Sequence, residues 1–299
     1  MSTSRATICV IAAATLWGCI SLFTRALNTA GLDSVQITAI RMTVGAVGLG
    51  LLLLFTDREK FRIRLRDLWM FFGTGIVSLT LFNLCYFTMV QHSEPSIAVV
   101  LLYTSPVFVM LMSALFFKER ITPRKLVALA LTMAGCVLVA GVLGGSAQLT
   151  PLLLLIGIAS GFFYATYSIF GTVALRRYHP LTMAFYTFVM AAACSLALSN
   201  CGQIVSTLAA NTNNACWYAL GIGILCTLLP YILYNQGLKH LEPSRAGILA
   251  TAEPVVGSLI GIFVFGDSTG VLKLVGMALI LTSVVVLSLP ESTMKRQSR

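Results

Sequence analysis

The sequence predicts an all-α integral membrane protein with about ten transmembrane helices, arranged as two inverted five-helix repeats with both termini in the cytoplasm. Composition, ten long apolar stretches and an internal repeat lead to this prediction. Of the 299 residues, 58% are hydrophobic and only 10% are charged, whereas soluble domains carry about 25% charged residues. The few charges gather in short clusters between apolar runs, which indicates that most of the surface faces lipid.

Ten segments are long and apolar enough to cross a bilayer. A membrane helix needs about 20 mostly apolar residues to cross about 30 Å of hydrocarbon. The predicted spans are 6–27, 34–55, 68–90, 95–117, 124–142, 151–173, 180–200, 216–238, 243–265 and 270–289. A chain of this kind is expected in the cell membrane as a multi-pass protein.

The positions of the basic residues predict the orientation. Lys and Arg of short loops concentrate on the cytoplasmic side. With a cytoplasmic N-terminus, that side collects nearly all loop cations, and only Arg25 and Lys273 fall on the other side. The formal charge of +10 is therefore interpreted as a topology signal, and no nucleic-acid partner is expected.

An internal repeat divides the chain into a first half, 1–147, and a second half, 148–299. The segment His92-Ser93-Glu94-Pro95-Ser96 matches His240-Leu241-Glu242-Pro243-Ser244, 148 residues further on. The same offset holds along the next helix and beyond it. It pairs Ala98 with Ala246, Leu101 with Leu249, Pro106 with Pro254, Phe117 with Phe265, Glu119 with Asp267, and Lys125 with Lys273.

Because each repeat holds five helices, an odd number, the second copy enters the membrane from the opposite side. Inverted repeats of this kind are common in secondary transporters, in which two equivalent halves expose one central site alternately to each side. The alternative is a duplicated helix bundle without a transport role. The repeat favours a carrier.

The residues resemble the drug/metabolite transporter superfamily and, within it, the EamA-type carriers. The resemblance covers nearly the whole chain and rests on short motifs in a fixed order. They are Leu16-Trp17-Gly18, Arg41, Pro106, Phe117-Lys118-Glu119-Arg120, Glu242-Pro243-Ser244-Arg245-Ala246, Glu253-Pro254, Phe265-Gly266-Asp267 and Gly276. The stretch from Asp267 to Thr269 departs from the commoner acidic-basic ending of the second repeat.

The resemblance implies a central cavity surrounded by helices one to four and six to nine, with helices five and ten outside. It also implies a secondary transporter of a small organic solute that works by alternating access. Export of amino acids or related metabolites is the function it favours. Relatives that carry drugs, quaternary amines or nucleotide sugars leave those solute classes as alternatives.

Two ionisable residues inside predicted spans are the first candidates for a substrate site, because charges at membrane depth are costly and usually functional. Glu253 lies near the middle of helix nine, and Pro254 after it predicts a kink. Its carboxyl group could bind a proton or a cationic group, or only cross-link helices. Arg41 lies about 10 Å along helix two. It could bind an anionic group, pair with Glu253, or reach the interface with its long side chain.

Aromatic and amide side chains near the same depth are further candidates. Trp17 and Tyr164 lie at the midpoints of helices one and six, so they form either an aromatic wall for an organic solute or ordinary packing. Five more residues either bind solute or bridge helices at about 1 kcal/mol each. These are Asn83, Tyr86, Tyr103, Tyr234 and Asn235.

Other functional classes find less support in the sequence. The chain has no HExxH or GxSxG motif and no paired intramembrane carboxylates, so an enzyme is not expected. A channel would need rings of like groups or a repeated filter sequence. Without a P-loop, direct use of ATP is not expected, and no cofactor or metal is predicted. The expected partners are a small solute and membrane lipid, with a homodimer left open.

Two cysteines could form a disulfide. Cys201 and Cys216 flank one loop between neighbouring predicted helices, and a bridge there requires an oxidising compartment. The other six cysteines lie mostly inside apolar runs and are interpreted as small packing residues.

Overall fold

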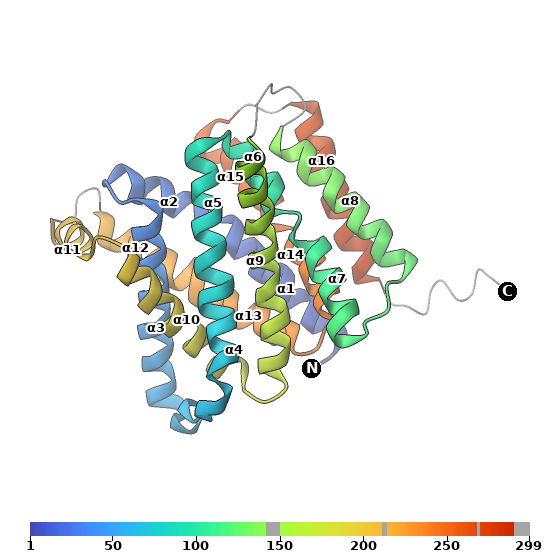
Figure 1. Cartoon of the computed structure of the whole chain (residues 1–299). Coiled ribbons are helices and arrows are strands. Elements are labelled where there is room, and N and C mark those ends of the chain that lie inside the picture. Colours follow the sequence, from blue (N-terminus) through green and yellow to red (C-terminus); the bar gives the residue numbers. More distant parts are fainter. Residues whose placement is uncertain (142–149, 211–213, 268–269, 290–299) are drawn as a thin grey trace.

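The computed structural model describes residues 1–141, 150–210, 214–267 and 270–289 (Figure 1). Within these ranges, ten helical segments are long and apolar enough to span a membrane, which confirms the predicted number. The predicted boundary between the two halves, 147/148, lies outside the described residues.

The first five spans are built from several consecutive helical elements. In chain order they are α1 (Thr3–Gly18), α2 (Ile20–Thr29), α3 (Ser34–Thr56), η1 (Arg58–Phe61), η2 (Leu65–Asp67), α4 (Leu68–Phe72), η3 (Gly73–Thr80), α5 (Leu81–His92), α6 (Pro95–Leu102), α7 (Ser105–Phe117) and α8 (Pro123–Ala140). The second five are α9 (Pro151–Leu175), α10 (Pro180–Leu198), α11 (Cys201–Ala210), α12 (Ala215–Gly223), η6 (Ile224–Leu228), α13 (Leu229–Leu238), α14 (Pro243–Ala250), α15 (Glu253–Phe265) and α16 (Val271–Ser288).

Local sequence explains where several of these helices begin. Asp33 and Gln36 form a reciprocal capping box at the start of α3, which satisfies two otherwise unpaired amides. Thr122 and Thr150 cap α8 and α9, and each is followed by a proline at the first helical position. Proline is suited to that position, since its missing N–H would have no helical partner there.

The structural repeat follows the sequence repeat. The bounds of α14, α15 and α16 each lie 148 residues after those of α6, α7 and α8. Helices α7 and α15 end at left-handed residues with the same offset, Lys118 (φ 56°) and Gly266 (φ 68°). The third and eighth spans both contain a π-helical stretch, η3 and η6. The two halves are therefore copies of one helical unit.

The fourth and ninth spans are broken near their middle. Helix α6 stops before Tyr103, and α14 stops before Thr251. Pro106 and Pro254 follow the breaks, and proline lacks an N–H and clashes with the carbonyl four residues before it. The kink predicted at Glu253-Pro254 is therefore a full interruption, and the interruption in the fourth span has the same cause.

A glycine of the other half packs against each break. A Cβ added to Gly161 of α9 would lie 2.7 Å from the carbonyl oxygen of Leu101, and one added to Gly18 of α1 would lie 2.9 Å from that of Glu253. Only glycine allows a helix to approach this closely. The first span of each half thus covers the broken span of the other.

The bundle has two faces. The amino-terminal face is the end at which α1 begins, and the mouth face is the opposite end, where α2 finishes. Helices α8 and α16, the fifth and tenth spans, lie side by side at one edge of the bundle (Figure 1), as the resemblance implied. Arg124 at the start of α8 donates from Nε to the Val286 carbonyl (2.6 Å) and so satisfies a carbonyl in the last turn of α16.

The two cysteines considered for a disulfide both act as hydrogen-bond donors. The Cys201 thiol donates to the carbonyl of Leu196 and the Cys216 thiol to that of Leu208, at 3.3 and 3.0 Å. The bridge left open by the sequence is therefore not formed in this structure.

Replacement of Gly161 with alanine is expected to lower the stability of the purified protein by about 1–3 kcal/mol, the usual cost of forcing extra atoms into a packed site. The thermal unfolding midpoint in detergent measures the effect. The matched control is Gly257→Ala inside α15, because a Cβ added at Gly257 meets its nearest atom, the Gly18 carbonyl oxygen, at an ordinary contact distance of 3.6 Å. Equal midpoints for the two variants would show that α9 can move away from the break.

Candidate functional site

A cavity of about 570 Å³ lies between the two halves and opens at the mouth face. This volume lies within the range of small-molecule sites. Its rim is formed by residues at helix ends on that face, namely Asn28, Ser34, Pro95, Ser96, Ala140, Asp267 and Lys273. Its walls come mainly from spans one to four, six, eight and nine. In the predicted orientation, this is the carrier open to the outside.

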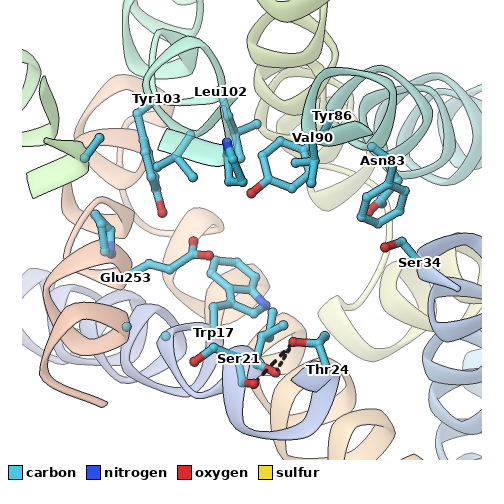
Figure 2. Close-up of a pocket in the computed structure, with 18 of the residues that line it drawn as sticks. Trp17, Ser21, Thr24, Ser34, Asn83, Tyr86, Val90, Leu102, Tyr103 and Glu253 are labelled. Carbon is cyan, nitrogen blue, oxygen red and sulfur yellow. Dashed lines mark hydrogen bonds between the residues drawn. The ribbon is translucent and has the colours of Figure 1, made fainter. Parts of the chain in front are cut away.

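Glu253 lies on the wall of the cavity at the first position of α15. Figure 2 shows its carboxyl group pointing into the open space between Trp17 and Tyr103. The break before α15 places the carboxylate at a helix N-terminus, where the helix dipole favours negative charge. The local interruption is therefore what makes an acidic side chain tolerable at this depth.

Arg41 faces the same cavity from α3. Its Nε donates to the hydroxyl of Thr227 at 3.1 Å, and Thr227 lies in the π-helical segment η6. This hydrogen bond holds the side chain toward the bundle interior and not toward the interface. Among the described residues, no ion pair within 4.0 Å forms at Arg41 or at Glu253. The two opposite charges thus share one cavity without neutralising each other directly.

Aromatic side chains form much of the remaining wall. Four of the five aromatic candidates, Trp17, Tyr86, Tyr103 and Tyr164, line the cavity, and so do Phe82, Phe87 and Tyr231. The ring of Trp17 packs edge-on against Tyr231 with centroids 5.1 Å apart, and Phe82 packs against Tyr164 at 5.2 Å.

The three additional aromatic residues were missed at the sequence level. Tyr231 had a usable signal, because it lies 148 residues after the candidate Asn83. Phe82 and Phe87 had none, since phenylalanine is ordinary in any membrane helix. Their place on the wall depends on the rotation of α5.

The amide and tyrosine candidates fall into two groups. Asn83 lines the cavity, and its side chain donates to the Leu79 carbonyl at 2.5 Å. Tyr234 and Asn235 are not among the lining residues. The Tyr234 hydroxyl is 2.8 Å from that of Ser168, and Asn235 accepts from Tyr167 at 2.9 Å. These two residues therefore bridge α13 to α9. Of the two roles expected from the sequence, binding solute or bridging helices, this position corresponds to bridging.

Apart from the rim residues Asp267 and Lys273, the cavity offers one carboxylate, one guanidinium and a wall of aromatic rings, which can hold an organic solute by charge, hydrogen bonds and ring contacts.

A sequence model of the EamA-like transporter family matches residues 4–141 and 151–289. An uncharacterized transporter of Archaeoglobus fulgidus is 30% identical over 93% of this chain and 94% of its own length. An aromatic amino acid exporter of Ancylobacter novellus, YddG, is 26% identical over 87% of this chain and 88% of its own. A solved crystal structure aligns over the full length of both chains with a TM-score of 0.81 and 19% identity. This last likeness concerns the fold alone.

A cysteine placed on the cavity wall tests where the cavity opens. Ser258→Cys in α15 is expected to react with a membrane-impermeant maleimide added to whole cells, measured as labelling gained over the parent chain, because Ser258 lines the open cavity. The matched control is Ser283→Cys, since Ser283 is fully buried and should gain no label. Labelling of Ser258→Cys only from the cytoplasmic side would overturn the predicted orientation.

Proposed function

Because the chain belongs to the EamA-like transporter family, we propose that this multi-pass membrane transporter exports amino acids or closely related zwitterionic metabolites, with aromatic and large apolar side chains preferred. The family and its relatives are named as transporters and not as enzymes. The observation that carries the proposal is the pair of unpaired opposite charges, Arg41 and Glu253, on one aromatic cavity.

A zwitterion matches these charges in both sign and number. Its carboxylate complements the guanidinium of Arg41, and planar guanidinium groups bind carboxylates through two parallel hydrogen bonds. Its ammonium group complements the carboxylate of Glu253, and Trp17 and Tyr103 beside it supply ring faces that attract cations. A solute with only a positive charge would leave Arg41 unpaired, and one with only a negative charge would leave Glu253 unpaired. An unpaired charge in a partly desolvated site costs free energy.

The aromatic wall supports a preference for the solute side chain. Seven aromatic residues line the cavity, and each well-packed ring pair adds about 0.5–1.5 kcal/mol beyond its buried area. The relative named as an aromatic amino acid exporter agrees with this preference. A quaternary amine, the next candidate, fits Glu253 and the rings but is repelled by Arg41.

Transport by purified protein in liposomes tests the zwitterion assignment. A panel of radiolabelled amino acids is offered to native protein and to Glu253→Gln and Arg41→Gln. Each variant is expected to lose about ten- to hundredfold in Vmax/KM, because each removes charge-assisted hydrogen bonding to the solute worth at least about 1.5–3 kcal/mol. Glu59→Gln, an exposed surface change, is the matched control and should transport normally. Saturable flux that survives both cavity variants would exclude this site.

Side-chain preference is tested separately. Tyr86→Leu is expected to raise the KM for tryptophan by about 2- to 12-fold, from the loss of one ring contact, and to leave the KM for leucine nearly unchanged. Competition by unlabelled choline serves as the measure of the amine alternative. Strong inhibition by choline together with no amino acid flux would favour that alternative and reject the zwitterion.

A further inference from the structure

A cluster of ionic side chains closes the bundle at the amino-terminal face, with Lys125 and Glu119 buried and Glu242 exposed at its edge. Lys125, at the start of α8, pairs with Glu119 at 2.5 Å and with Glu242 at 2.7 Å. The hydroxyl of Ser244 donates to the carboxylate of Glu119. Glu119 and Lys125 belong to the first half of the chain, and Glu242 and Ser244 to the second. These four residues, called here the closed cluster, therefore join the two halves below the cavity.

The internal repeat gives every member of the closed cluster a counterpart on the mouth face. At the offset of 148 residues, the counterparts are Asp267 for Glu119, Lys273 for Lys125, Glu94 for Glu242, and Ser96 for Ser244. The chemistry of each position is retained, and α6, α7 and α8 match α14, α15 and α16 in their bounds. Asp267, Lys273, Glu94 and Ser96 are called here the rim set. They form a second copy of the same donor and acceptor set on the opposite face.

The rim set is not assembled in this structure. Lys273 makes no ion pair within 4.0 Å in the part of the chain that the structure describes. Asp267 instead faces Arg25 of α2 at 3.7 Å, and both side chains are about half exposed. Ser96 makes a long contact of 3.5 Å with Glu94. Asp267, Lys273 and Ser96 all line the rim of the open cavity.

We propose that the rim set is a second lock, which assembles when the carrier closes its mouth and opens its amino-terminal face. Lys273 then pairs with Asp267 and Glu94, Ser96 donates to Asp267, and the closed cluster separates. In an inverted-repeat carrier, each half takes the conformation of the other when the open side changes. Contacts seen on the closed face of one state are therefore expected on the opposite face in the other state.

The exchange has an energetic reason. Leaving one partner of a buried ion pair unmatched costs about 3–5 kcal/mol, which would trap a carrier that had a lock on one face only. With two locks of the same composition, the loss of one is offset by the formation of the other. Arg25 is the competitor in this exchange, because it holds Asp267 in the open state and packs over Phe265 at 3.9 Å. Closing the mouth requires Arg25 to release Asp267.

The first test reads the conformational balance without any substrate, so it is independent of the zwitterion proposal. In Ser258→Cys protein, Lys125→Met should lower the rate of maleimide labelling from the mouth side several-fold. The reason is that it removes the closed cluster, which keeps the amino-terminal face shut and the mouth open. Lys273→Met should keep labelling at or above the starting rate. The double variant should return toward the starting rate. Unchanged labelling in Lys125→Met, or a fall in Lys273→Met, would overturn the exchange.

The second test probes the proposed contact between Lys273 and Glu94 by exchanging their charges. Lys273→Glu should reduce transport at least about tenfold, because mouth closure would then bring three carboxylates together. Adding Glu94→Lys should restore most of the rate. The matched control adds Glu59→Lys, which makes the same charge change at an exposed site away from the rim, and should restore nothing. Equal rates for the two double variants would reject a Lys273–Glu94 contact, provided that both elute as monodisperse protein.

Discussion

Backbone amides and carbonyls need partners at membrane depth, and this requirement governs the two helix breaks on which the centre of the protein depends. An interrupted helix is tolerated there only where it is buried in protein or lines a cavity. Both breaks meet this condition, because Gly161 of α9 packs on the first and Gly18 of α1 on the second. The same interruption places Glu253 at the start of α15, where the helix dipole favours negative charge.

The halves are alike in architecture and unlike in the chemistry of their cavity walls. Glu253 of the second half corresponds to Ser105 of the first at the repeat offset, so the acidic group of the cavity occurs in one copy. The ionic residues at the two faces, in contrast, occur in two copies. Under the two proposals made above, this distribution separates solute recognition from gating. An asymmetric solute needs different groups around it, whereas the two closed states need equal stability.

Most of the fold could be predicted from the sequence, for clear physical reasons. Apolar length predicts spans, because lipid offers no hydrogen bonds to the backbone. The repeat with an odd number of helices predicts an inverted second half. Pro254 predicts a kink beside Glu253, which the structure shows as a full interruption. Lys125, however, looked like one more loop cation in a basic cluster, and the structure places it buried between two carboxylates. Its partner Glu242 comes from the other half, and no local pattern connects them.

The sequence by itself determined that the protein lies in a lipid bilayer, that it has ten spans and that its two halves repeat. It also determined the depth of Glu253, Arg41, Trp17 and Tyr164, since depth follows from residue order along a helix. Only the tertiary structure decided which side chains share the cavity. It brought Arg41 inward through Thr227, added Tyr231 to the wall, and left Tyr234 and Asn235 as bridges to α9. Depth is a property of a single helix, whereas rotation about the helix axis is set by packing against neighbours that lie far away in the sequence.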